Sequence, residues 1–149
     1  MNRFLDPAAP GITRLSLAST PQSVRAALEH LFSRPPLAHW PEEARGTAEI
    51  VMAEVLNNIV EHAYGADGGV IEMSLCREEG GIQCHIADTG RPFPFGTPPE
   101  GILPDLSEDL PEGGFGWALI RAYAENLRYE RCEGWNHIQF HISAGLPEI

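Results

Sequence analysis

Residues 54–64, with the sequence E-V-L-N-N-I-V-E-H-A-Y, lie at the centre of a helix that we predict over residues 41–65. At about 100° per residue, apolar side chains fill one continuous half of this helix, which is typical of a helix packed on a core. This half consists of Val51, Met52, Val55, Leu56, Ile59, Val60 and Ala63. The helix therefore predicts where the core of the protein lies.

The opposite side of the same helix is unusual for a solvated surface. It carries Glu54, Asn57, Asn58, Glu61 and His62 and no lysine or arginine. An ordinary exposed face mixes charges, and neighbouring asparagines lower helix stability. Carboxylate and amide oxygens one turn apart suit a hard cation such as magnesium. We therefore keep two interpretations of this face, a magnesium site and an exposed surface without function.

Length and composition indicate one acidic domain. The chain has 149 residues, 43% of them hydrophobic, and we predict a flexible leader over residues 1–11 and a single domain over residues 12–149. The formal charge of -11 arises from 21 acidic residues and 10 arginines, without lysine. This charge argues against direct binding to nucleic acid or to an anionic membrane. No apolar run approaches the roughly 20 residues that a membrane-spanning helix needs.

The cysteines suggest the compartment in which the protein works. Cys76, Cys84 and Cys132 lack C-x-x-C spacing and lie in strand-like segments. An odd number of cysteines without such spacing favours buried free thiols over a disulfide or zinc framework. Because the first residues also differ from a signal peptide, we expect a cytoplasmic protein.

Local patterns predict five strands and two further helices. Alternating polar and apolar residues predict strands at 12–18, 70–77, 82–88, 127–132 and 137–143. Thr20 as N-cap and Pro21 as first residue predict a helix that closes at Pro35-Pro36, and another helix is predicted over residues 117–126. Turns at 78–81 and 133–136 would close two hairpins. His137 and His141 share a strand face without a third ligand nearby, so we expect them to be exposed or interfacial rather than metal-bound.

Three segments carry further candidate chemistry. Asp88-Thr-Gly-Arg-Pro places a carboxylate at the end of a strand and a glycine where a ligand could approach, although such a sequence is usually a simple turn. Residues 92–112 contain six prolines, five acidic residues and no basic residue, which indicates a long loop, either a lid or an inert insertion. Residues 113–116, G-G-F-G, precede a helix, and the free N–H groups there can hold phosphate oxygens.

The order of these segments resembles the N, G1, lid and G2 elements of the Bergerat-type ATP-binding fold of gyrase, histidine kinases and mismatch-repair ATPases. The E-x-x-x-N-x-x-x-H-A-Y helix, D-T-G-R-P-F and G-G-F-G-W-A-L-I look like the anti-sigma-factor serine/threonine kinases of bacterial stress and sporulation switches. The resemblance covers residues 12–143. It implies an α/β two-layer sandwich, with a mixed, mostly antiparallel sheet against three principal helices, and ATP between the central helix and a lid over residues 92–112.

The resemblance assigns roles on the central helix. Asn58 matches the asparagine that binds magnesium, and Glu54, one turn earlier, matches the proposed general base of catalysis. Asn57 and Glu61 lie on the same arc but do not match the central motif positions, so we treat them only as supporting residues. The expected cofactors are ATP and Mg²⁺.

The remaining motifs supply the rest of the expected nucleotide site. Asp88 matches the aspartate that accepts a hydrogen bond from the adenine amino group, and Gly90 gives the ring room. Gly114 and Gly116 match the glycines that contact phosphate. One departure is Glu112, which stands where some kinases of this group carry a basic or hydroxyl residue.

The function implied is that of an ATP-binding anti-sigma regulator. It would phosphorylate an anti-sigma antagonist protein on serine or threonine and sequester a sigma factor, without contacting nucleic acid or membrane, and the resemblance implies a homodimer. An alternative is a non-catalytic module that sequesters a regulator, which the acidic surface and the cation-free lid favour. The catalytic fragment of a histidine kinase fits poorly, because one strand and one short helix precede the central helix and His30 is expected on a helix surface.

Overall fold

The computed structural model describes residues 11–64, 68–93 and 115–145. The predicted leader, apart from Gly11, lies outside these residues, as does the predicted lid apart from its first two residues. The first strand and the first helix lie close to their predicted positions. β1 (Ile12–Ala18) has the predicted bounds, and α1 (Pro21–Phe32) begins at the predicted proline.

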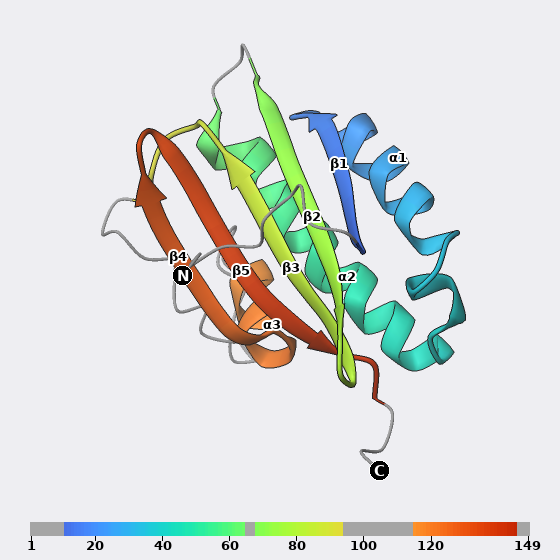
Figure 1. The fold of residues 1–149 in the computed structure, drawn as a ribbon. Helices are drawn as coiled ribbons and strands as arrows, with labels where there is room; N and C mark the ends of the chain where they lie inside the picture. The colour runs from blue at the N-terminus through green and yellow to red at the C-terminus, as the bar shows by residue number, and fades with distance from the viewer. Residues whose placement is uncertain (1–10, 65–67, 94–114, 146–149) are drawn as a thin grey trace, which may run out of the picture.

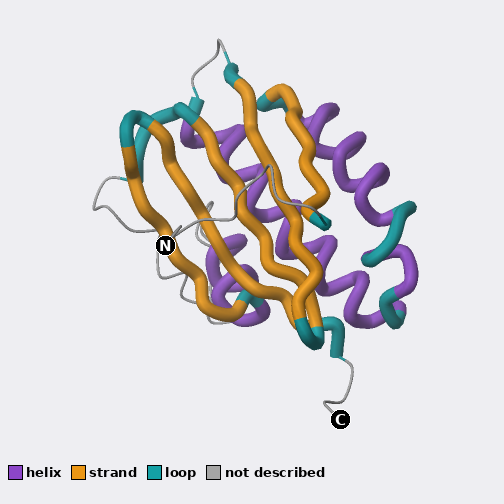
Figure 2. Tube along the Cα trace, in the orientation of Figure 1, coloured by secondary structure: helices purple, strands orange, loops and turns teal. Residues whose placement is uncertain are grey.

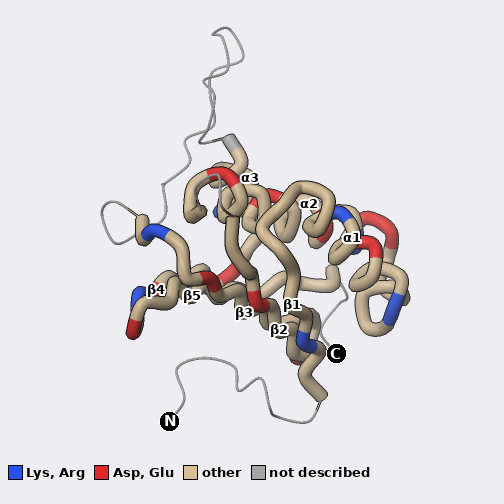
Figure 3. Tube along the Cα trace, turned by 90° about the horizontal axis from the view of Figure 1, so that it is seen from above, with Lys and Arg blue, Asp and Glu red and all other residues tan. Residues whose placement is uncertain are grey.

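The fold consists of a sheet covered by helices on one face. The sheet order is β1-β2-β3-β5-β4, with β2 (Val70–Glu78), β3 (Gly81–Asp88), β4 (Glu125–Cys132) and β5 (Trp135–Ser143). The helices α1, α2 (Glu42–Asn58) and α3 (Phe115–Tyr123) lie together on one side of this sheet (Figures 1 and 2), and the view from above shows the two layers (Figure 3). This confirms the α/β sandwich with three principal helices. All the described strand pairs are antiparallel, so the sheet is antiparallel rather than mixed.

Helix α1 has the capping that its sequence predicts. The backbone N–H of Ser23 donates to Oγ1 of Thr20 at 3.1 Å, and Pro21 occupies the first turn, where a missing N–H costs nothing. Its buried side chains are Val24, Ala27, Leu28 and Leu31. The helix ends at Phe32, before the two prolines, and a 3-10 helix, η1 (Leu37–His39), leads into α2.

Helix α2 is the central element of the helical layer. Val51, Met52, Val55 and Leu56 are all 0% exposed, as the apolar half of the predicted helix requires. The α-helix stops at Asn58, however, and residues Ile59–Ala63 form a π-helical turn, η2, where the sequence predicted an uninterrupted α-helix. Single π-helical turns of this kind are frequent at functional sites.

The C-terminal elements differ from the prediction at four boundaries, since α3 begins at Phe115 rather than at residue 117 and β4 begins at Glu125 rather than at residue 127. Helix α3 ends at Tyr123 rather than at residue 126, because the N–H of Ala124 makes the last helical hydrogen bond, to Ile120, and the chain then enters β4. Strand β5 begins at Trp135 rather than at residue 137, because Glu133 (φ 51°) and Gly134 (φ 83°) form a two-residue hairpin turn. Both positive φ values depend on the tertiary fold and leave little trace in the hydrophobic pattern.

The core lies between the sheet and the helices. Its fully buried side chains include Met52, Leu56, Ile86, Ile120, Ile138 and Phe140. Burial of each such side chain contributes about 1.5–3 kcal/mol relative to exposure. On the opposite face of the sheet, the strand register aligns Ser74, His85 and Gln139, each 6–9% exposed.

Two further expectations concern the cysteines and the membrane. Cys76, Cys84 and Cys132 are free thiols, as predicted, but only Cys84 is buried. Burial raises the pKa of the Cys84 thiol far above its usual value. Within the described ranges, none of the helices combines the length and apolar character required to cross a membrane.

Candidate functional site

Glu54 and Asn58 lie one turn apart on the half-buried side of α2. Nδ2 of Asn58 donates a hydrogen bond of 2.7 Å to the backbone carbonyl oxygen of Glu54. This bond occupies the donor side of the amide and leaves Oδ1 of Asn58 as the acceptor. The polar side of α2, which we call its polar arc, therefore presents two kinds of oxygen, an amide oxygen and a carboxylate oxygen.

The first turn of α3 packs directly on this arc. A Cβ atom added to Gly116 would overlap the carboxylate of Glu54 and would lie 3.4 Å from Nδ2 of Asn58. With glycine at this position the Glu54 carboxylate can stay where it is, whereas any side chain would force it to move. Three of the predicted site residues thus meet where the positive end of the α3 dipole faces the polar arc of α2, an arrangement that suits an anionic ligand and its counter-ion.

Asp88 forms a second part of the site at the end of β3. It is 2% exposed, and its Oδ1 accepts hydrogen bonds from the backbone N–H of Gly90 at 2.8 Å and from Nδ2 of Asn136 at 2.9 Å. No described residue donates to Oδ2. Burial raises the pKa of Asp88, although the bonds from Asn136 and Gly90 and the charge of Arg131 oppose this shift.

The end of the α2–η2 helix is joined to the turn that follows β3. A Cβ atom on Gly90 would overlap the carbonyl of Ala63, and the backbone N–H of Arg91 donates to the same Ala63 oxygen at 2.6 Å. Next to this contact, the backbone N–H of Thr89 donates to the hydroxyl of Tyr64 at 2.8 Å. The element that carries Asn58 is thus fixed to the strand that carries Asp88 through Ala63 and Tyr64, the last two residues of the H-A-Y sequence.

The other predicted residues are less closely involved. Gly114, Glu112 and most of the predicted lid lie outside the described residues. Asn57 is half-buried, and the Glu61 side chain is 68% exposed, with its carboxylate 3.5 Å from Nε2 of His62. Among the described residues, neither Asn57 nor Glu61 makes a hydrogen bond or ion pair to Glu54 or Asn58, so their supporting role stays a prediction.

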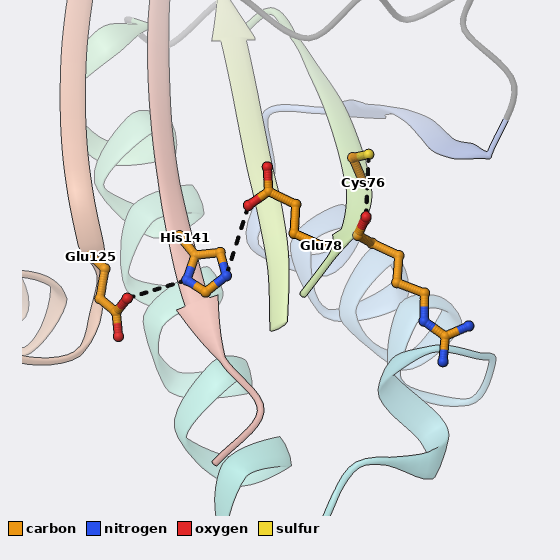
Figure 4. Close-up of polar contacts among 5 residues, drawn as sticks. Cys76, Glu78, Glu125 and His141 are labelled. Carbon is orange, nitrogen blue, oxygen red and sulfur yellow. Dashed lines mark hydrogen bonds and ion pairs between the residues drawn. The ribbon is translucent and has the colours of Figure 1, made fainter. Parts of the chain in front are cut away.

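The strand histidines occupy the face of the sheet that is opposite to the helices. Nε2 of His85 and Nδ1 of His137 lie 2.9 Å apart. His141 of β5 lies between two carboxylates, 3.8 Å from Glu78 at the end of β2 and 3.3 Å from Glu125 at the start of the neighbouring β4 (Figure 4). Its side chain is 15% exposed, so the expectation of an exposed residue is wrong for His141 and the interfacial alternative stays open. Across the three described ranges, no group of three His, Cys, Asp or Glu side chains is placed to hold a metal ion.

Sequence reasoning missed Asn136, which it placed in a turn. Asn136 is 3% exposed, is the first residue of β5 that pairs with β3 and lies directly opposite Asp88 in that register. The available signal was a polar residue just before the alternating segment that starts at residue 137. That signal identifies no partner, because the pairing joins residues 48 positions apart.

Comparison with known proteins agrees with this geometry. The family model of the histidine kinase-like ATPase domain matches residues 17–142. The chain belongs to this family. Within it, the serine/threonine-protein kinase BtrW of Bordetella bronchiseptica is 33% identical over 125 residues, which are 81% of this chain and 83% of BtrW. The resemblance to bacterial serine/threonine kinases of this fold is therefore confirmed.

Two further relatives extend the comparison. The serine-protein kinase RsbW of Bacillus thuringiensis is 33% identical over 90 residues, and the match spans 58% of this chain but only 56% of RsbW. The crystal structure of the RsbU and RsbW domains of Rv1364c from Mycobacterium tuberculosis superposes with a TM-score of 0.62 at 16% identity, covering 91% of this chain and 32% of that chain. At this identity the structural likeness supports the fold alone.

The residues present fit a magnesium–nucleotide ligand. Oδ1 of Asn58 and the carboxylate of Glu54 are hard oxygen donors, which magnesium prefers, and magnesium needs few protein ligands because it retains several waters. Oδ2 of Asp88 is an acceptor at the other part of the site. The family, the fold and the arrangement of Glu54, Asn58, Asp88, Gly90 and Gly116 thus point to the same class of ligand.

Proposed function

We propose that this chain is an ATP-dependent serine/threonine kinase of the anti-sigma type. The observation that carries the proposal is the packing of Gly116 on Glu54 and Asn58, which brings the N-terminal turn of α3 next to the Glu54 carboxylate and the Asn58 side-chain amide. The names of BtrW and RsbW, both serine kinases, support the assignment. The steps below follow from the chemistry of the residues.

Asp88 would recognise the adenine base. Its Oδ1 is already occupied by two donors, so Oδ2 is left to accept a hydrogen bond from the 6-amino group of adenine. Gly90 has no side chain that could obstruct the ring. A purine without an amino group at this position would leave a buried carboxylate oxygen unpaired, which is costly and therefore selective.

The phosphates would lie at the start of α3. Backbone N–H groups of the first helical turn are free to donate to phosphate oxygens, and Gly116 allows them to come close to α2. Asn58 would hold magnesium through Oδ1. When bound, magnesium neutralises charge on the phosphate oxygens. The protein contributes mainly by positioning these groups, because phosphoryl transfer requires little covalent chemistry from the enzyme.

Glu54 would act on the attacking hydroxyl group. The serine or threonine oxygen of the partner forms a bond to the γ-phosphorus, the bond from that phosphorus to the β–γ bridging oxygen breaks, and ADP leaves. The hydroxyl proton passes to the Glu54 carboxylate and then to solvent. The backbone of Glu54 is fixed within α2, and its carboxylate lies against Gly116.

The proposed partners are an anti-sigma antagonist, as phosphate acceptor, and a sigma factor, which the protein sequesters. The formal charge of -11 would attract partners with a basic docking surface and disfavour direct contact with nucleic acid. A cytoplasmic location and a homodimer complete the proposal. The cytoplasmic location rests on the free cysteines, and the homodimer on the resemblance to the anti-sigma kinases.

Transfer of radiolabelled γ-phosphate to a purified antagonist protein tests the proposal. The variant Glu54→Gln should reduce the rate roughly 100- to 10,000-fold, the usual contribution of a general base, while nucleotide binding is retained. Glu49→Gln is the matched control, because it removes the same charge from an exposed position on the same helix. Equal rates for wild type and Glu54→Gln would contradict the catalytic role of Glu54.

A non-catalytic module that sequesters a regulator is the second candidate. The strongly acidic charge and the presence of Glu112 ahead of the glycines favour it, because a carboxylate near the γ-phosphate would oppose transfer. Partner capture measured with and without Mg-ATP separates the two functions. Capture that is unaffected both by ATP and by Asn58→Ala, with no labelled partner, would favour sequestration.

A further inference from the structure

We infer that Asn136 is a positioning residue for nucleotide recognition: its side-chain amide orients the Asp88 carboxylate and fixes the turn that follows β3. The inference rests on the proposed nucleotide site and extends it to strands β4 and β5. Asn136 would not touch the nucleotide itself. It would act through Asp88, on the neighbouring central strand (Figure 1).

The donor side of the amide faces three acceptors. Nδ2 of Asn136 lies 2.9 Å from Oδ1 of Asp88, 3.1 Å from the carbonyl oxygen of Gly90 and 3.1 Å from that of Arg91. An amide nitrogen has two hydrogens, so these three contacts share them. One side chain therefore binds both the carboxylate and two consecutive carbonyls of the turn.

The acceptor side of the same amide determines its orientation. Oδ1 of Asn136 accepts hydrogen bonds from the hydroxyl of Tyr129 at 2.6 Å and from Nη1 of Arg131 at 3.1 Å. Because an arginine can only donate, the atom that faces Arg131 must be the oxygen. A flipped amide would turn its NH₂ group toward Arg131 and its oxygen toward the Asp88 carboxylate, so the network favours one orientation.

This orientation has a direct effect on Asp88. Two donors converge on Oδ1, one from Gly90 and one from Asn136, and they fix the plane of the carboxylate. Burial disfavours the ionised carboxylate and raises its pKa, and among the groups that oppose this shift Asn136 contributes the most. Asn136 thus helps to keep Asp88 both ionised and directed, as an acceptor for an amino group must be.

The network continues toward the phosphate side of the site. Nη1 of Arg131 also donates to the carbonyl oxygen of Gly90 at 2.6 Å, and the backbone N–H of Phe93 donates to the Tyr129 hydroxyl at 3.3 Å. The ring of Phe93 stands edge-on to Tyr129, with centroids 4.8 Å apart, and edge-on to Trp117 of α3, at 5.4 Å. Strand β4, the turn after β3 and helix α3 are therefore joined around Asn136.

Nucleotide selectivity provides the test, because a merely structural role would not change it. The affinities of the full chain for Mg-ATP and for the triphosphate of purine riboside, which lacks the 6-amino group, are measured by calorimetry. Wild type should prefer ATP by about 10-fold or more, the effect of one lost hydrogen bond in a buried site. In Asn136→Ala, ATP binding should weaken by about 10- to 100-fold, and the ratio of the affinities for the two nucleotides should approach one.

A second variant adds a signature that depends on pH. Asn136→Asp places two carboxyl groups in contact, and such a pair retains one proton to a higher pH than either group alone. The protonated carboxyl can donate to Asp88 as the amide does. ATP affinity of this variant should therefore rise as the pH is lowered from 8 to 6, whereas Asn136→Ala should not show such recovery. Tyr129→Phe, which removes a donor to Asn136, should show an intermediate loss of preference for ATP.

The control and the contrary outcomes separate this inference from the proposed function. Gln139→Ala, a buried polar position on the same strand but on the opposite sheet face, should leave the preference for ATP unchanged. If wild type prefers ATP and Asn136→Ala keeps that preference, the positioning role is wrong and the nucleotide site stands. If wild type does not distinguish the two nucleotides, both the adenine site and the inference are overturned. If Asn136→Ala does not fold, the Tyr129→Phe variant provides the test. A reduced preference for ATP in that variant supports the positioning role, and an unchanged preference contradicts it.

Discussion

The hydroxyl oxygen of Tyr64 accepts a hydrogen bond of 2.8 Å from the backbone N–H of Thr89. The same hydroxyl donates to the carbonyl oxygen of Val70 at 2.7 Å. Tyr64 follows the π-turn η2 directly, and Thr89 follows Asp88, so this hydroxyl connects the helix that carries the catalytic candidates with the turn that carries the adenine-binding candidate. A single phenolic oxygen thus couples both parts of the site.

The variant Tyr64→Phe removes both of these bonds and leaves the ring in place. Because water can reach this half-buried position, we expect the free energy of unfolding to fall by only about 1 kcal/mol. ATP affinity should fall several-fold, because the turn after Asp88 loses one of its anchors. Urea denaturation and calorimetric titration measure the two effects. Tyr123→Phe, at a position 52% exposed, is the control, and equal ATP affinity for Tyr64→Phe and wild type would contradict the coupling.

Two glycine-to-alanine variants separate helix propensity from site geometry. Gly46 lies within α2, and a Cβ atom there meets nothing within 4 Å, so Gly46→Ala should stabilise the protein by about 0.5–1 kcal/mol. Gly116 lies in α3, but an added Cβ would overlap the Glu54 carboxylate. Gly116→Ala should therefore not stabilise the protein as Gly46→Ala does. It should also reduce the rate of phosphoryl transfer at least 10-fold, because the Glu54 side chain must move.

Thermal unfolding and phosphate transfer, measured side by side on the two variants, check this prediction. The substitution and the type of element are the same, so the difference reports the contact with Glu54. A Gly116→Ala protein that is as stable as Gly46→Ala and fully active would show that α3 does not press on the Glu54 carboxylate.

Features of the fold that depend on local sequence could be predicted. β1 and the start of α1 follow from alternation and from the Thr20–Pro21 cap, and the buried face of α2 follows from its helical period. The site residues Glu54 and Asn58 were found for the same reason, since a one-turn spacing puts them on one side of a helix. The G-G-F-G segment with Gly116 was selected as a possible phosphate-binding helix start, but nothing in the sequence indicated the contact of Gly116 with Glu54.

Features that depend on long-range pairing could not be predicted. Asn136 reaches Asp88 only because β3 and β5 pair in one particular register. The π-turn η2 coincides with the docking of Ala63 on Gly90, which is a tertiary contact rather than a local preference. The early end of α3 at Tyr123 likewise reflects a tertiary feature, because Glu125 already pairs with His141 of β5.

The pair formed by His85 and His137, on the sheet face opposite to the helices, leads to a prediction about how stability depends on pH. His85 is 9% exposed, and its ring is stacked on His137 with centroids 5.1 Å apart. Burial, and the positive charge that His137 would carry, lower the pKa of His85 from 6.5 to about 4. Burial also lowers the pKa of His137, although Glu130 and Asp88 oppose that shift. At neutral pH both rings are therefore uncharged in the folded protein.

Acid should destabilise the protein through His85. In the unfolded chain this histidine takes up a proton as the pH falls below 6.5, whereas the folded state resists protonation until about pH 4. The stability contribution is therefore complete above pH 6.5 and is lost between these values, by about 2 kcal/mol at pH 5. Asp88 acts in the opposite sense, because its raised pKa lets the folded state bind a proton as the pH falls.

Comparison of variants isolates the contribution of His85, since Asp88 is common to all of them. Urea midpoints of wild type and His85→Gln, measured from pH 7.5 to pH 5, should show a smaller loss of stability in the variant. His30→Gln, which removes an exposed histidine from α1, should retain the full dependence of wild type. If His85→Gln loses as much stability as wild type over this range, the buried pair does not resist protonation. The acid sensitivity would then arise from another group.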